Sequence, residues 1–261
     1  MQPLKFYYLI KVQYLGYRLH GWQRQPNFKT VEGLIKKTLK FVLPGRRLKI
    51  LGSSRTDAMV SANDAAFELF LYDTPLEDQE AFLELFNLNL PPDIRAVSIS
   101  EVDASFNIIQ QPKNKEYLYL FSSGSKSHPF CAPLMANFQD ELDIEAMTAG
   151  ALLFQGEHYF GNYCVDPGEN SVLVRTINTC NLSLNDIYTA SFFPEKSYIF
   201  KVSGAGFLRY QIRLMMGTLV QLGKGEITLD QIQKSLDPEC TMQMNYIAPA
   251  SGLILNKIDF D

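Results

Sequence analysis

The sequence has few of the residues and motifs that mark metal, redox or nucleotide-hydrolysing sites. Its four cysteines and three histidines are scattered through 261 residues, and they form no CxxC, HExxH or similar ligand spacing. The phosphate-binding patterns GxxxxGK[ST] and GxGxxG and the hydrolase pattern GxSxG are also missing. We therefore expect reduced, structural thiols and no metal, and we look for chemistry among carboxylates, tyrosines and arginines.

The chain also lacks a long apolar run and an excess of positive charge. No stretch reaches the length of a membrane span, and the amino terminus MQPLKFYYLIKVQYLG does not have the pattern of a signal peptide. These features predict a cytoplasmic protein that does not contact membranes. With 24 Lys and Arg against 28 Asp and Glu, the net charge of −4 provides no general attraction to nucleic acid. Any RNA-binding surface therefore has to be a local concentration of basic residues.

Apolar periodicity predicts an α+β fold built in two related parts. In the first part, alternation predicts strands at 8–14, 48–51, 65–71, 94–102 and 115–122, and helical spacing predicts helices at 31–42, capped by Thr30, and at 77–88. After an irregular connection at 123–141, we expect helices at 142–154 and 206–222, strands at 172–183 and 197–203, a helix starting with a Thr228–Gln231 capping box, and a final strand at 252–260. Because the order is not strictly βαβ, the sheet should be mainly antiparallel.

A polar turn between two predicted strands is the best candidate for catalysis. It reads SSRTDAMVSA at 53–62. From this turn Asp57 would project beside a rigid sheet, and a nearby guanidinium, from Arg55 or Arg213, would keep its carboxylate ionised. The alternative interpretation is a purely structural turn, since Ser, Thr and Asp side chains also bond their own backbone in turns.

Two arginines and a tyrosine in the second part are further candidates. Arg209 and Arg213 lie four residues apart in the predicted helix 206–222, so we expect both on one helix face. Such a pair needs a partner, either a carboxylate or a phosphate, unless both side chains extend to solvent at a domain edge. Tyr117, in the strand 115–122, is either a packing residue or a stacking surface.

Seven short motifs in one order then identify a resemblance. They are GWQRQ at 21–25, SRTDAMVSA at 54–62, LNLPPDI at 88–94, KEYLY at 115–119, RTI at 175–177, GFLRYQIRLMMG at 206–217 and GLIL at 252–255. Over essentially the whole chain they resemble the tRNA pseudouridine synthases of the TruA type. The resemblance implies isomerisation of tRNA uridines to pseudouridine, most typically in the anticodon stem-loop, by an aspartate carboxylate without a cofactor. A non-catalytic RNA-binding relative is the alternative.

The resemblance also implies an architecture. Two α+β domains, 1–104 and 105–261, would share a mixed, mostly antiparallel central sheet with helices on its outer face and the active cleft between the domains. Members of the family are commonly homodimers that bind one tRNA with both subunits.

The resemblance assigns roles residue by residue. Asp57 matches the catalytic aspartate, Arg213 the arginine that pairs with it, and Tyr117 the tyrosine that stacks on the target uracil. The substrate-binding positions, apart from Tyr117 itself, are Arg55, which contacts RNA, Arg209, and Leu253, which packs near the active site.

Several positions depart from the family pattern. Ser54 and Met59 stand in place of glycines and Ser61 in place of a histidine, and a methionine is unfavourable at position 59 if φ is positive there. Ile109 replaces an arginine, and Glu116 stands where the family has a basic residue. Tyr159 replaces an aspartate. Losing basic residues predicts weaker RNA binding rather than altered chemistry.

Overall fold

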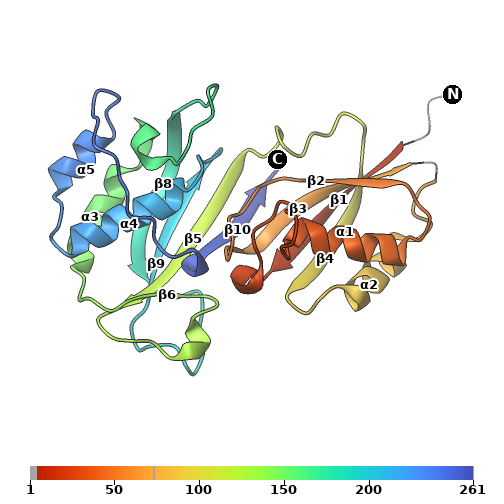
Figure 1. Cartoon of the computed structure of the whole chain (residues 1–261), viewed down its shortest axis with the longest axis horizontal. Helices are drawn as coiled ribbons and strands as arrows, with labels where there is room; N and C mark the ends of the chain where they lie inside the picture. Colours follow the sequence, from red (N-terminus) through yellow and green to blue (C-terminus); the bar gives the residue numbers. More distant parts are fainter. Residues whose placement is uncertain (1–4, 73, 261) are drawn as a thin grey trace. The chain divides into compact units, whose positions relative to one another are not determined.

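The computed structural model describes residues 5–72 and 74–260, and the chain divides into two compact units. The first unit runs to Lys113 and includes the stretch from Leu255 onward, and the second is Asn114–Ile254. Each unit combines β-strands with helices, so the predicted α+β class is confirmed (Figure 1). Within the described ranges, no helix is both long and apolar enough to cross a membrane.

The first unit is centred on the antiparallel strands β1 and β3. β1 (Lys5–Tyr14) pairs antiparallel with β3 (Ser61–Tyr72) and with β4 (Ile94–Val102), and β2 (Leu48–Gly52) pairs antiparallel with β3. β10 (Leu253–Asp259) follows β3 in the strand order. Alternate residues of β1 are buried, as the sequence period predicts.

Two helices accompany this sheet. α1 (Val31–Val42) and α2 (Gln79–Asn89) contact each other, and α2 also packs against β4 (Figure 1). Thr30 caps α1 as predicted, because its Oγ1 accepts a hydrogen bond of 3.2 Å from the Gly33 N–H. The apolar stripe of α1 is buried, so the helix covers the core of this unit.

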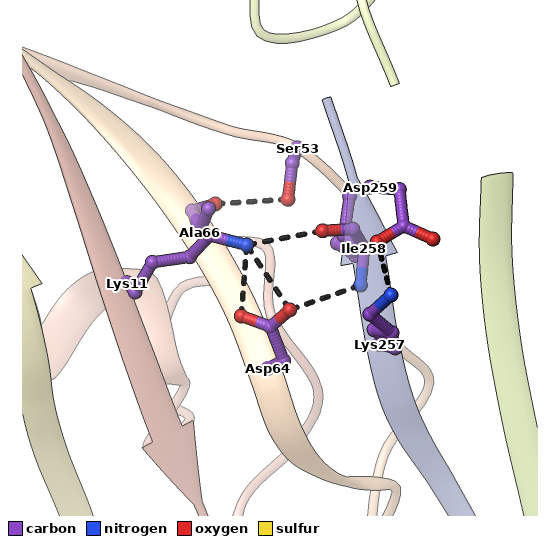
Figure 2. A network of polar contacts seen from close by, with 7 residues as sticks. All are labelled: Lys11, Ser53, Asp64, Ala66, Lys257, Ile258 and Asp259. Carbon is purple, nitrogen blue, oxygen red and sulfur yellow. Dashed lines mark hydrogen bonds and ion pairs between the residues drawn. The ribbon is translucent and has the colours of Figure 1, made fainter. Parts of the chain in front are cut away.

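A half-buried polar network secures β10 in the first unit (Figure 2). Lys11 Nζ lies 2.9 Å from Asp64 Oδ1 and donates a hydrogen bond of 3.1 Å to the Ile258 carbonyl. Asp64 Oδ2 in turn accepts the Ile258 N–H at 3.1 Å. Asn63 donates to the Asn256 side-chain oxygen at 2.9 Å. The carboxyl-terminal strand is thereby joined by side chains to β1 and β3, far from it in sequence.

The strands of the second unit form the other part of a ten-stranded sheet. β5 (Asn114–Ser123) pairs antiparallel with β9 (Tyr198–Gly204), β9 with β8 (Val174–Leu184), and β8 with β7 (Gly156–Tyr159). β6 (Ala136–Phe138) pairs parallel with β5, which makes the strand arrangement mixed but mostly antiparallel, as predicted. β6 lies inside the segment that we expected to be irregular. A strand of three residues is too short to produce a readable alternation.

Three helices belong to the second unit: α3 (Ile144–Leu153), α4 (Gln211–Gly223) and α5 (Leu229–Ser235). The capping box of α5 is confirmed, since Thr228 and Gln231 exchange both hydrogen bonds. The prediction of a helix from residue 206 is wrong, because Tyr210 has φ of 63°, a left-handed conformation that α-helical backbone cannot contain. Arg209 therefore lies before the helix, and it does not share a helix face with Arg213.

Candidate active site

Asp57 lies in the turn between β2 and β3, and its side chain is partly exposed. The turn starts at Ser53, whose hydroxyl donates a hydrogen bond of 3.0 Å to the Ala66 carbonyl of β3 (Figure 2). It closes where the Val60 N–H donates to the Asp57 carbonyl at 3.3 Å. Arg55, two residues before Asp57, is exposed. The turn therefore presents a carboxylate and a guanidinium at the edge of a rigid sheet.

A distant segment, residues 16–22, clamps this turn through its backbone. The Trp22 N–H donates to the Thr56 carbonyl and the Met59 N–H donates to the Leu19 carbonyl, both at 3.0 Å. A Cβ atom at Gly21 would lie 2.6 Å from the Thr56 oxygen, so this close approach requires glycine. The conspicuous GWQRQ motif thus has a structural role, in which its glycine and its buried tryptophan hold the turn that carries Asp57.

Side chains reinforce these backbone bonds, and the segment 53–62 contains three of the residues that depart from the family pattern. Tyr14 and Thr56 share a buried hydrogen bond of 2.8 Å between their hydroxyls. Ser61 is buried and its hydroxyl accepts the Gly16 N–H at 2.9 Å. Met59 has φ of 67°, a left-handed conformation that is unfavourable for methionine. Ser54 Oγ is buried and has no hydrogen-bond partner among the described residues.

In the second unit, Tyr117 lies on β5 opposite Val202 of β9. Its ring meets the ring of Phe207 edge to face, with centroids 5.3 Å apart. The side chain is half-buried, which fits an aromatic surface open on one side. Two residues further along, Tyr119 is fully buried, and this burial raises the pKa of its phenol well above the ordinary value.

Arg213 lies in the first turn of α4, and its Nε donates a hydrogen bond of 2.8 Å to the Ala248 carbonyl. Sequence reasoning missed the residue that brings the two arginines together. The guanidinium carbons of Arg209 and Arg213 lie 5.2 and 5.0 Å from the ring centroid of Tyr210, so both cations contact one aromatic ring. Arg209 also approaches Asp166 at 3.8 Å on the exposed surface. The sequence LRYQIR, in which Tyr210 lies between the two arginines, could have indicated this contact.

The remaining departures have local explanations. Ile109 is exposed, and Glu116 forms an ion pair of 2.7 Å with Lys201, so neither position adds positive charge. The Tyr159 hydroxyl passes over Gly161, where a Cβ would lie 2.2 Å from it. Arg175 Nε, one strand away, is buried and lacks a hydrogen-bond partner in the described part of the chain. Leu253, at the start of β10, is buried.

Comparisons with known proteins identify relatives of this chain. A family profile described as tRNA pseudouridine synthase matches residues 151–261. The tRNA pseudouridine synthase A of Acetivibrio thermocellus is 30% identical over 247 residues, which cover 95% of this chain and 96% of that protein. The protein of the same name from Halalkalibacterium halodurans is 30% identical over 246 residues, covering 94% and 89%. The tRNA pseudouridine synthase A 2 of Bacillus cereus is 29% identical over 255 residues, covering 97% and 99%.

Similarity along nearly the whole length to these enzymes defines the class: the protein is an isomerase of the pseudouridine synthase type. Within this class, the chain belongs to the tRNA pseudouridine synthase A family.

Proposed function

We propose that this protein converts uridine to pseudouridine in tRNA, in the anticodon stem-loop, with Asp57 as the catalytic carboxylate. The observation that carries the proposal is the position of Asp57, a partly exposed carboxylate on a turn that backbone hydrogen bonds from residues 16–22 hold in one conformation. Family membership supports the reaction and the substrate. The protein would act in the cytoplasm as a homodimer, for which family resemblance is the support.

The chemistry suits these residues. The N1–C1′ bond of uridine breaks, the uracil turns, C5 bonds to C1′, and a proton leaves C5 while N1 gains one. Atoms and electrons balance without an oxidant or a co-substrate. The reaction therefore needs only a carboxylate that stabilises or attacks the electron-poor centre and a surface that retains the detached base. The target nucleotide has to leave its stack to reach such a carboxylate.

The other candidate residues have separate roles in this reaction. We propose that Arg213 keeps the Asp57 carboxylate ionised and that Tyr117 stacks on the uracil, so that Asp57 from residues 1–104 and the other two from residues 105–261 act on one nucleotide. The exposed arginines Arg55 and Arg209 bind RNA, and Leu253 supplies an apolar contact. The exposure of both arginines and the half-buried ring of Tyr117 support these roles.

The deciding experiment uses purified protein and an unmodified tRNA transcript, with pseudouridine located by carbodiimide labelling and primer extension. We expect wild-type protein to modify the anticodon stem-loop and Asp57→Asn to lower turnover by at least about 10³-fold. Transcript affinity should change by less than about threefold, because phosphate contacts dominate it. Glu101→Gln, the same kind of change at an exposed residue of β4, is the matched control and should keep full activity.

Two results would refute the proposal. Full turnover by Asp57→Asn would remove Asp57 as the catalytic group. If wild-type protein binds the transcript without modifying it, and tRNA from cells lacking the gene keeps every pseudouridine, the protein is a non-catalytic RNA-binding relative.

A further inference from the structure

We propose that Tyr119 is a positioning residue for Arg213, acting through the irregular segment 243–249, which we call the strap. The inference rests on the proposed function for its catalytic consequence, but its structural content concerns the second unit alone. Tyr119 does not need to touch RNA for this role.

The first contact joins Tyr119 to the strap. Tyr119 lies in the middle of β5, paired with Phe200 of β9, and it is fully buried. Its hydroxyl donates a hydrogen bond of 2.7 Å to the Pro249 carbonyl. Because the ring is held in a paired strand, the hydroxyl is a fixed point to which the end of the strap is attached.

The second contact joins the strap to Arg213. The Arg213 Nε–H donates to the Ala248 carbonyl at 2.8 Å, and the Ala248 N–H donates to the Arg213 carbonyl at 3.0 Å. Ala248 is thus bonded to both the main chain and the side chain of Arg213, and its neighbour Pro249 carries the bond to Tyr119. Since a guanidinium is planar, fixing its Nε–H restricts the directions in which its terminal nitrogens point.

The start of the strap is anchored where the Met244 N–H donates to the Asn162 carbonyl at 3.1 Å, and the Tyr119 bond holds its other end. The segment has no regular secondary structure. A pocket of about 490 Å³ is lined in part by four residues of the strap, of which Met244 is buried: Gln243, Met244, Asn245 and Ile247. On the helix side it lies directly on α4, where a Cβ at Gly217 would come within 1.7 Å of the Tyr246 carbonyl oxygen. A small displacement of the strap would therefore move Ala248 and turn Arg213.

Tyr119→Phe removes the hydroxyl and keeps the ring, so it releases Pro249 without emptying the core. Misplacing a reacting group by about 1 Å costs up to about 10²-fold in rate. We therefore expect kcat to fall about 10- to 100-fold while KM changes by less than about threefold, because the RNA contacts are untouched.

Tyr163→Phe is the matched control. Tyr163 is also a fully buried tyrosine of the second unit, and its hydroxyl shares a hydrogen bond of 2.6 Å with the hydroxyl of Ser235, the last residue of α5. Both variants should lower Tm by a similar amount, about 2–4 °C. Only Tyr119→Phe should lower kcat.

A second pair of variants displaces the strap from the other side. In Gly217→Ala the new methyl group meets the backbone of Tyr246, so the strap has to move, and kcat should fall as in Tyr119→Phe. In Gly223→Ala, on the same helix, the new methyl group meets the flexible end of Met147 at 2.8 Å, and activity should be kept.

Proton exchange at Arg213 Nε, followed by ¹⁵N NMR, tests the positioning without any turnover. Loosening the strap exposes this N–H, so its exchange should accelerate at least about tenfold in Tyr119→Phe and stay unchanged in Tyr163→Phe. Unchanged exchange in Tyr119→Phe, or equal losses of kcat in the two tyrosine variants, would overturn the inference. If wild-type protein modifies no RNA, the proposed function fails, and the exchange rates still decide whether Tyr119 positions Arg213.

Discussion

The two units hold their candidate catalytic groups in different ways. In the first, Asp57 sits on an irregular turn that is clamped mainly by backbone hydrogen bonds and by glycines at close approach. In the second, Tyr117 and Arg213 stand on a strand and a helix, and the side chains of Tyr119 and Arg213 bond an irregular strap that also has backbone hydrogen bonds. A turn held mainly by backbone hydrogen bonds should be sensitive to added atoms, whereas a strap that also depends on side chains should be sensitive to deleted hydrogen-bonding groups.

The largest effect should come from adding one methyl group to the clamp of the first unit. Gly21 has φ of 81°, and a Cβ there would lie 2.6 Å from the Thr56 carbonyl oxygen. Gly21→Ala should therefore destabilise the protein by about 3 kcal/mol, from strain and backbone clash together, and abolish turnover. Urea unfolding and the transcript assay measure the two losses.

Gly45→Ala separates the two causes. Gly45 has φ of 76°, but a Cβ added there would meet no atom within 4 Å, so its substitution should cost only the backbone strain, about 1 kcal/mol. Equal costs at the two glycines would show that the close approach of residues 16–22 to the Asp57 turn does not matter.

Asp64→Ala tests whether the first unit also depends on side chains. The change leaves the Ile258 N–H and the half-buried Lys11 ammonium without this acceptor, which should cost about 2 kcal/mol in urea unfolding. Asp259→Ala, which breaks the ion pair with the exposed Lys257, should cost less than about 0.5 kcal/mol. A negligible cost for Asp64→Ala would sharpen the contrast between backbone and side-chain anchoring.

Met59→Gly should stabilise the first unit slightly. Relief of the left-handed strain at φ of 67° is worth about 1 kcal/mol, and the added freedom of the unfolded chain returns about half of it, for a net gain of about 0.5 kcal/mol. Met59→Ala keeps the Cβ and should bring no gain. If alanine stabilises as much as glycine, the methionine side chain rather than the backbone is the source of the strain.

The smallest effect should be a pH-dependent one at Glu68 of β3. Burial raises the pKa of this carboxyl above its ordinary value of 4.5, against the opposing effects of the Ile108 N–H and Lys49. Because the pKa of Glu68 is raised in the folded state, its protonated form adds to the stability of the protein at low pH. This contribution is lost as the pH rises through the folded-state pKa. Glu68→Gln should therefore raise Tm at pH 7, by an amount on the order of 1 °C.

The advantage of Glu68→Gln should shrink as the pH falls toward about 4, where the wild-type carboxyl is protonated as well. Thermal melts between about pH 4 and pH 8 follow the difference, and Glu101→Gln, an exposed position on β4, should show none. An advantage that grows on acidification would have the wrong sign for a buried carboxyl.

Local features of the fold were predictable because local patterns encode them. The alternation of β1, the Thr30 cap and the capping box at Thr228 all depend on residues within a few positions of one another. The start of α4 was not predictable in this way. Residues 207–210 have helix-compatible side chains, and it is the left-handed backbone of Tyr210 that delays the helix to Gln211.

The order of residues along the chain was enough to identify the family and to nominate Asp57, Tyr117 and Arg213, because short motifs in a fixed order can be read without knowledge of the fold. What holds these residues in place became visible only in three dimensions. Tyr14 and Thr56, like Tyr119 and Pro249, are hydrogen-bonded although many residues separate them along the chain. No local pattern marks such partners, because a hydrogen bond forms only when folding brings two distant segments within about 3 Å.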